Sequence, residues 1–364
     1  MYMNINEARA AFAQDRAMLE AKGIVLPGVQ SYIPAGWESN FHLAMDAQPT
    51  LSTDPNSAVP AMLTTLIDPE VFRILFSPTQ AAAIYGEVKK GTWLDETAMF
   101  PVVEQTGEVS SYGDYSTNGS TGVNTNWPQR QSYLFQTIKQ YGQRELERAG
   151  LARIGWVSEL DAAAAQALNR FANLTYFFGV TGLQNYGALN DPNLSAALTP
   201  ATKAYGGTKW INNGVVQATA NEIYADIQSV YSQLVSQSGG LIDQNTPIIL
   251  AMSPGSAVAL TTTNAFGVNV EDLLKKNFPK ITIMTAVQYG VTSSSNPNGI
   301  AAGNFMQMIA KTVDGQQTAY VAFNEKQRAH PIVVDLSAFK QKVTAGTWGA
   351  IIRGAFGIAA MVGI

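Results

Sequence analysis

The chain contains no cysteine. This absence excludes disulfide bonds, thiolate nucleophiles and every metal site built on cysteine, so packing and hydrogen bonding alone must hold the fold together. Charged residues are also scarce, at 14% of the chain against about 25% in an ordinary soluble domain. A surface so poor in charge suits a subunit that buries much of its exterior against neighbours, because an uncharged polar group is less costly to bury than an unpaired ion.

Long apolar runs and export signals are missing as well. The most apolar stretch, Ile351–Ile364, is too short to span a bilayer and is interrupted by Arg353. We interpret it as a buried terminal strand, and we expect no membrane partner. The first residues carry charges such as Glu7 and Arg9, where a secretory signal needs an apolar core. Export is therefore not indicated.

Patterns that carry chemistry are absent too. The two histidines, His42 and His330, lie far apart in the sequence and in different expected elements. No phosphate-binding loop, zinc-protease helix or dinucleotide fingerprint occurs. The turn Ser253–Ser256 has only a superficial likeness to a nucleophile elbow, which needs a different glycine pattern, and we interpret it as a strand-to-helix cap. The sequence therefore predicts no catalytic residue, no cofactor and no metal site.

What the chain does have is enough apolar material for a substantial core. Its 364 residues are 46% hydrophobic, which suffices for one large core or two modest ones. The formal net charge is −4, so its long-range field repels nucleic acid, and a sequence-reading DNA-binding protein is disfavoured.

The N-terminal region predicts one helix and a long arm. Residues Asn4–Ala21 place apolar side chains at helical spacing, whereas Gly23–Pro60 is rich in Pro, Gly, Ser and Asn without clear periodicity. An arm of this length is uncommon in a compact domain unless something else orders it.

A long amphipathic helix is the clearest element of the sequence. Apolar side chains share one face through about 20 residues after Ser158, which corresponds to roughly 30 Å of helix. Ser158–Asp161 resembles a capping box at its start, and Gly179 suits its end. We therefore predict a helix over about 158–178.

A polar hairpin is expected before this helix. Thr97–Val103 and Ser132–Tyr141 have the pattern of strands, and the residues between them are mostly Gly, Ser, Thr and Asn. An isolated two-stranded hairpin is at best marginally stable in water, so another surface must lie beneath it.

Charge is distributed unevenly around this hairpin. Gly91–Gln129 contains acidic residues but no Lys or Arg, and a group of arginines follows. A solvated acidic loop is the simple interpretation. The alternative is that the hairpin of one subunit docks on a basic patch of the next. The inter-subunit contacts predicted on this basis are Glu104, Glu108, Asp114, Arg144, Arg148 and Arg153.

The rest of the chain predicts an α/β or α+β unit that is inserted between strands that belong together at the two ends. The expected helices are Asn221–Gln237, Pro254–Leu260 and Val270–Asn277, and the expected strands are Pro247–Met252 (a central one), Ile281–Val287, Phe305–Val313, Ala319–Phe323, Phe339–Val343, Trp348–Ile352 and a short one around Val333.

The order of these elements resembles the Hong Kong 97-type capsid fold of tailed bacteriophages and encapsulins. The passages that carry the likeness are FPVVEQTGEVSSYGDY, YGQRELERAG, NLTYFFGVTGLQNYGALNDP and RGAFGIAAMVGI. They are similar to a branch of phage major capsid proteins long described only as a domain of unknown function.

The resemblance implies a domain plan. It gives an N-terminal helix and arm at 1–60, a peripheral domain at 61–90 and 132–205 that includes the spine helix, an extended loop at 91–131, an axial domain at 206–325, and a return to the peripheral domain at 326–364.

The resemblance also implies a function and partners. The chain would be the self-assembling subunit of an icosahedral or prolate phage head around double-stranded DNA, which it contacts non-specifically. Copies would form hexamers and pentamers, with portal, scaffolding and decoration proteins as further partners. The chain would assemble in the bacterial host cytoplasm and would reside in the virion capsid.

One departure from the fold's pattern concerns cross-linking. Some members join neighbours covalently through a lysine of the extended loop, but no lysine lies between Gly91 and Ile138. We therefore expect a non-covalent shell. Two alternatives stay open from the sequence: an encapsulin-type nanocompartment shell, and a soluble α/β enzyme without a recognised motif.

Overall fold

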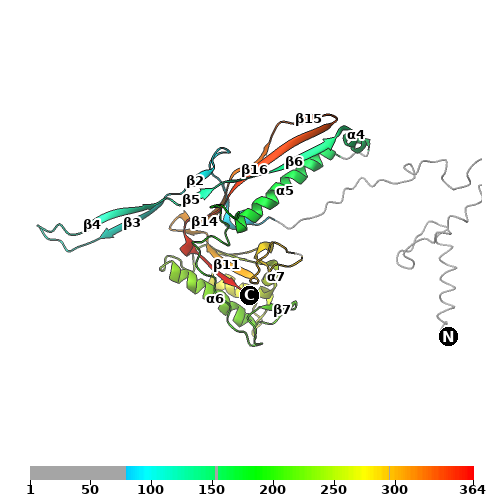
Figure 1. Ribbon diagram of the computed structural model, residues 1–364. Helices are drawn as coiled ribbons and strands as arrows, with labels where there is room; N and C mark the ends of the chain where they lie inside the picture. Colours follow the sequence, from blue (N-terminus) through cyan, green and yellow to red (C-terminus); the bar gives the residue numbers. More distant parts are fainter. Residues whose placement is uncertain (1–78, 152–154, 295) are drawn as a thin grey trace, which may run out of the picture. The chain divides into compact units, whose positions relative to one another are not determined.

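The computed structural model describes residues 79–151, 155–294 and 296–364. The expected N-terminal helix and arm lie outside the described residues, as do His42, the expected peripheral segment up to residue 78, and Arg153. Two larger sheets and two long helices organise the described part, which is coloured along the chain in Figure 1.

The five-stranded sheet is built around the long strand β16 (Ala338–Ile352). This strand pairs antiparallel with β14 (Ala319–Ala329), β15 (Val333–Asp335) and β6 (Tyr133–Gly142). Strand β1 (Glu87–Lys89) adds to β14 in parallel. Strands from the two ends of the described chain therefore share one sheet, as predicted from the sequence.

The four-stranded sheet has the order β10 (Ile281–Thr285), β9 (Ile248–Met252), β11 (Phe305–Ala310) and β17 (Ile358–Val362). Strands β10 and β9 are parallel, and the other two pairs are antiparallel. Every residue of β9 and β11 is buried. Continuous apolar runs are typical of strands covered on both faces, and β9 is central as predicted.

Each face of this sheet packs against a different layer. Alternate residues such as Leu250 and Met308 join the core formed with α6 (Ala220–Gln237) and α8 (Val270–Asn277). The residues between them, such as Ile249 and Ile309, pack with α5 (Trp156–Phe178) and the inner end of the five-stranded sheet. The period of two along each strand therefore joins the two sheets through one shared core.

A buried polar cluster lies inside this shared core. The Tyr85 and Tyr289 hydroxyls both donate to Oε1 of Gln307 on β11, and Gln307 Nε2 donates to the Ala188 carbonyl at 3.2 Å. Burial raises the pKa of both tyrosines above the ordinary value, so both stay protonated and able to donate. The cluster therefore supplies hydrogen-bond partners to Gln307, the one polar side chain that β11 places in this core.

The start of α5 differs from the capping box expected at Ser158. The helix begins at Trp156 after Gly155, and the Ser158 hydroxyl donates to the Gly155 carbonyl at 2.7 Å. Ser158 therefore lies in the first turn and is not the cap, so that prediction was wrong. Gly179 ends the helix with φ of 65°, as its freedom in left-handed backbone predicts.

The capping box that does form belongs to α6. The Thr219 hydroxyl accepts from the Glu222 amide at 3.4 Å, and the Glu222 carboxylate accepts from the Thr219 amide at 2.8 Å. The pattern T-x-x-E was present in the sequence and was missed.

Two strands pair outside the sheet that their place in the expected domain plan suggests. Strand β14 begins at Ala319 within the five-stranded sheet, although the range 206–325 was expected to be the axial domain. Strand β17 pairs with β11 in the four-stranded sheet, although 326–364 was expected to return to the peripheral domain. The sequence pattern identifies strands but not their partners.

The remaining elements are short. They are α3 (Ala81–Tyr85), β2 (Thr97–Met99), β3 (Val102–Glu108), β4 (Ser120–Asn126), β5 (Gln129–Gln131), α4 (Gln143–Leu151), β7 (Ile211–Asn212), β8 (Val215–Val216), α7 (Pro254–Ala257), η2 (Val258–Thr261), η3 (Val287–Tyr289), β12 (Thr312–Val313), β13 (Gln316–Gln317) and η4 (Ala355–Gly357). None of the helices in the described part combines the length and apolarity that a membrane crossing requires.

Candidate assembly surfaces

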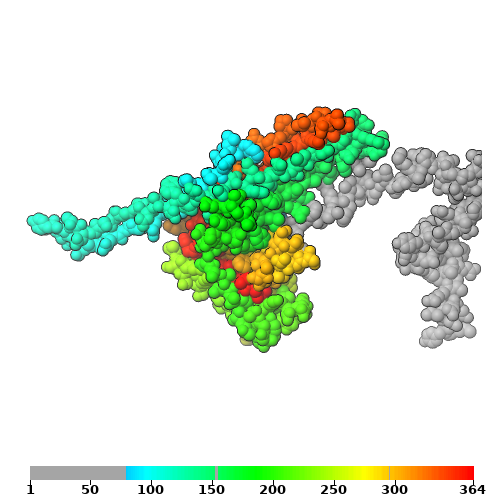
Figure 2. All heavy atoms as spheres, in the orientation of Figure 1, coloured from blue at the N-terminus to red at the C-terminus, as the bar shows by residue number. Residues whose placement is uncertain are grey.

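The hairpin of β3 and β4 is paired within itself and nowhere buried. Its register runs from Val102 opposite Asn126 to Glu108 opposite Ser120. Every residue of both strands is exposed, and Figure 2 shows its cyan atoms with no other coloured atoms over them in that view. A two-stranded ribbon without an apolar layer beneath it has little stability of its own.

The tip of the hairpin exposes aromatic side chains. Tyr115 is 100% exposed and Tyr112 is 92% exposed. The tip is ordered by local bonds, since the Ser110 hydroxyl donates to the Asn118 carbonyl at 2.8 Å. Exposed tyrosines on an ordered loop are typical of contact surfaces, because they bury much area at a low entropic cost.

The three acidic residues predicted as contacts all lie on this hairpin and are exposed. Glu104 accepts from the Asn124 side chain across the strands at 3.3 Å, and Asp114 accepts from the Tyr112 hydroxyl at 2.7 Å. Glu108 stands at the last pair before the tip. They form no ion pair within the described part of the chain.

The base of the hairpin, in contrast, is firmly anchored. Arg130 of β5 is buried, and its Nη2 lies 2.7 Å from Oδ2 of the buried Asp191. Its guanidinium also lies 4.9 Å from the ring centroid of Tyr186. A buried bonded ion pair of this kind fixes position more than it adds stability. The base of the hairpin is therefore fixed to the rest of the subunit, whereas its two strands are exposed.

The arginines predicted as the docking patch lie on α4. Arg144 and Arg148 are both exposed there, whereas Arg153 is outside the described residues. Glu145 accepts from the Gly142 amide at 3.2 Å, and Glu147 accepts from Gln143 at 3.2 Å. Two glutamates lie between the two arginines in the sequence, so α4 carries both signs, which weakens the basic patch that the sequence suggested.

A second free surface is the outer face of the β6–β16 sheet. The inner face packs against α5, where the rings of Phe135 and Phe171 lie 4.7 Å apart. On the outer face Leu134 and Ile138 are exposed, and Ile138 pairs with the exposed Lys342 of β16. The strict alternation in YLFQTIKQYG was the signal for this face, and the sequence reasoning did not use it.

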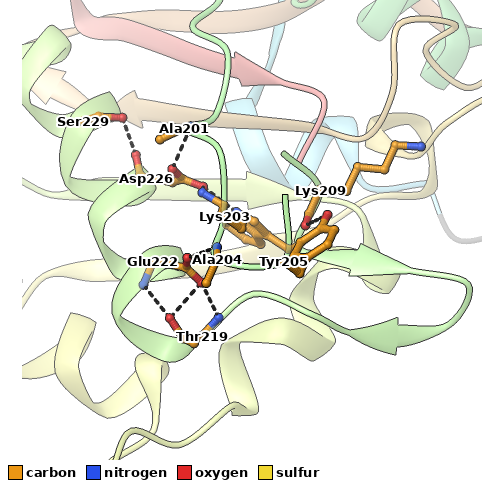
Figure 3. A network of polar contacts seen from close by, with 10 residues as sticks. Ala201, Lys203, Ala204, Tyr205, Lys209, Thr219, Glu222, Asp226 and Ser229 are labelled. Carbon is orange, nitrogen blue, oxygen red and sulfur yellow. Dashed lines mark hydrogen bonds and ion pairs between the residues drawn. The ribbon is translucent and has the colours of Figure 1, made fainter. Parts of the chain in front are cut away.

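A buried polar network joins helix α6 to the segment that precedes it in the chain (Figure 3). Lys203 and Trp210 Nε1 both bind Oδ2 of Asp226 on α6, the indole at 2.7 Å. The Glu222 carboxylate also accepts from the Ala204 amide at 2.7 Å. These bonds hold the segment from Ala201 to Trp210 onto α6, so the position of this segment is fixed within the subunit.

The candidates for chemistry have structural roles. Ser253 caps α7 by accepting from the Ser256 amide at 3.0 Å, as predicted. His330 Nε2 lies 3.1 Å from the Thr344 hydroxyl. Within the described ranges, no group of three or more His, Cys, Asp or Glu side chains could hold a metal ion.

Comparison with known proteins supplies the context for these surfaces. The family model of the Pa193 gp26 major capsid protein matches residues 50–363. No curated protein matches the chain in sequence.

Several solved phage capsids share the fold. The capsid of Myoviridae phage XM1 covers 84% of this chain and 99% of its own, with a TM-score of 0.65 and 13% identity. A Gordonia phage Cozz structure covers 87% and 98%, with a TM-score of 0.56 and 10% identity. The capsid of an empty GTA particle covers 85% and 99%, with a TM-score of 0.53 and 12% identity.

The fold is therefore the α+β fold of Hong Kong 97-type phage capsids, as the order of elements predicted. The role is structural: copies of the chain form a shell, and its place is the virion capsid. The compartment and enzyme alternatives are not favoured. Because the family match extends over residues 50–363, the chain belongs to the Pa193 gp26 major capsid protein family.

Proposed function

We propose that copies of this chain join into hexamers and pentamers that close an icosahedral or prolate head around double-stranded DNA. In this proposal the five-stranded sheet with α5 is the peripheral domain, and the four-stranded sheet with α6 and α8 is the axial domain. The shell is non-covalent. Assembly takes place in the host cytoplasm, and the negative net charge limits the chain to non-specific contact with DNA.

The observation that carries this proposal is the anchored hairpin with no buried residue. The base of the hairpin is fixed by the buried Arg130–Asp191 ion pair, while both strands are exposed along their full length. A ribbon of this kind gains the apolar burial that it lacks when it lies on another surface. In a shell, the available surface is an adjacent copy of the same chain.

The receiving surface, in our proposal, is the outer face of β6 and β16 together with α4. This face offers Ile138 to Val102, which lies on the same face of the hairpin as Glu104 and Glu108 because successive side chains of a strand alternate. Lys342 and the arginines of α4 would face Glu104, Glu108 and Asp114. Exposed ion pairs contribute only about 0–1 kcal/mol each. The charges therefore orient the hairpin, and the apolar contacts supply more of the affinity.

Other partners follow from the same role. Portal, scaffolding and decoration proteins would bind the assembled shell or its precursor. The chain would carry out no catalysis and need no cofactor, since its polar clusters are braces between segments.

The test is a variant whose hairpin is shortened without a change in the register of its two strands. Glu104 pairs with Asn124, so residues Gln105–Val123 can be replaced by Asn-Gly, a dipeptide that favours a two-residue hairpin turn. The subunit should fold with an unchanged melting temperature, because the removed residues contact no core. Particles visible by electron microscopy should be lost.

A matched control replaces the exposed Val215 outside the hairpin with Ser and should assemble normally. Uniform particles formed by the shortened chain would contradict the docking proposal. A shortened chain that no longer folds would show instead that the hairpin supports its own subunit.

A further inference from the structure

The loop before α8 presents an aromatic side chain to solvent on a rigid support. Phe266 is 90% exposed. The Asn264 side chain accepts from the amides of Phe266 and Val268 at 2.9 and 3.1 Å, and the Asn264 amide donates to the Val268 carbonyl at 2.9 Å. The loop is therefore ordered before it contacts anything, which lowers the entropic cost of binding.

A cleft lies at another place in the same layer. It has a volume of about 230 Å³ and is lined by residues that include Leu241, Val313, Thr318 and Phe356. Leu241 and Phe356 are exposed at its rim. A cavity of about 150 Å³ is enough to hold a benzene ring, so this cleft has room for one aromatic side chain.

The cleft also contains an unsatisfied polar atom. Thr318 is 4% exposed, and its hydroxyl has no hydrogen-bond partner within the described part of the chain. Buried hydroxyls without partners are rare in native proteins. The wall of the cleft at Thr318 is therefore incompletely hydrogen-bonded in the isolated subunit.

The loop and the cleft lie at opposite ends of the four-stranded sheet. The cleft is at the Ile248 end, because Ala310 pairs with Ile248 and Val313 follows directly. Helix α8 leads into β10 at this same end, where Ile281 pairs with Ile248. The start of α8 and the Phe266 loop therefore lie toward the Met252 end.

This separation excludes contact within one copy and favours contact between copies. A five-residue strand spans roughly 16 Å, which the loop of the same chain does not bridge. A projecting side chain at one end of a subunit and a cleft at the other generate a head-to-tail contact, and such contacts form a ring when the rotation from copy to copy closes.

Charge offers one complementary contact for the same pairing. Glu271 and Asp272 open α8 beside the Phe266 loop, and Glu271 is already paired with Lys275 at 2.6 Å. Arg353 and Asp314 both line the cleft, and Lys311 lies two residues before Val313. A contact of Asp272 with Arg353 or Lys311 would favour the approach of the loop.

We propose that Phe266 of one copy inserts into the Leu241–Phe356 cleft of the next copy, so that the four-stranded layers join head to tail around each capsomer. The proposal rests on the shell function above. It assigns a specific contact to the axial layer, separate from the docking of the hairpin.

The experiment uses the cysteine-free chain as a background for cross-linking. In the double variant Phe266→Cys with Leu241→Cys, oxidised particles should give a ladder beyond dimers on a non-reducing gel. The single variants should give dimers at most, and Phe266→Cys with the exposed Leu94→Cys should give no ladder. Assembled particles of the double variant without a ladder would overturn the proposal.

A second variant covers the case in which the cysteine pair fails to assemble. Phe266→Asp should keep the melting temperature, since the side chain is exposed in the subunit. Its particle yield should fall at least about tenfold, the change that losing one buried aromatic contact makes to an association constant. Normal yield would refute the contact. Failure of the unaltered chain to form particles would count against the shell proposal itself.

Discussion

The hairpin of β3 and β4 and the pair of β9 and β11 are both antiparallel ladders, yet they differ in what stabilises them. Every residue of β9 and β11 is buried, and every residue of β3 and β4 is exposed. Backbone pairing is common to both, so apolar burial makes the difference. The inner strands are stabilised by their own chain, whereas the hairpin requires a neighbour.

The largest expected effect comes from the Lys203–Asp226 ion pair on α6. Asp226→Asn should lower the free energy of unfolding by about 3–5 kcal/mol, because it leaves the buried Lys203 ammonium without its counter-ion. Chemical denaturation of the unassembled subunit measures this loss. The hydrophobic double variant Lys203→Met with Asp226→Leu should lose less, since it leaves no unpaired ion. An equal loss in both variants would mean that packing, and not charge, is what the pair provides.

A smaller effect is expected at the α6 cap. Thr219→Ala should cost about 1 kcal/mol, the usual value for an N-cap. The pKa of Glu222 lies below its ordinary value because its carboxylate accepts from the Thr219 and Ala204 amides. Its contribution is therefore present above the unfolded-state pKa and disappears as the pH falls through the folded-state pKa.

Glu222→Gln tests this pH dependence. Melting curves between neutral and acidic pH should show the variant less stable than the parent at neutral pH, with the gap closing in acid. A gap that stays constant across the range would contradict the assignment of the pKa shift to these amides.

The smallest effect concerns the surface charges of α4. Arg144→Glu with Arg148→Glu should leave subunit stability unchanged and should weaken assembly, more at low salt than at high salt, because exposed pairs are screened. Particle yield across an ionic-strength series measures this. Glu147→Lys on the same helix is the control and should not weaken assembly. Equal yields at every salt concentration would remove α4 from the docking surface.

The sequence predicted the fold well where local patterns determine structure. The apolar face of α5, its end at Gly179 and the buried run of β9 all follow from periodicity and from glycine. Helix starts were harder, because Ser158 matched the composition of a cap but fell inside the helix, whereas Thr219 and Glu222 formed the real box.

Partners in space could not be predicted in the same way. Nothing local in the sequence places β17 beside β11, or buries Arg130 against Asp191 below the hairpin. The charge pattern suggested a basic patch at Arg144 and Arg148, but the interleaved glutamates weaken it. The Phe266 loop left no signal in composition, since its importance depends on exposure and on the Asn264 bonds.

The position of β17 sets an order of events during synthesis. Strand β11 is made before β17, so its edge stays open until Ile358–Val362 emerges. At about 5–20 residues per second, this interval lasts roughly 2–10 s. An open edge is a template for wrong pairing with another chain. The nascent subunit therefore passes through a short vulnerable period, which ends when its final strand completes the four-stranded sheet.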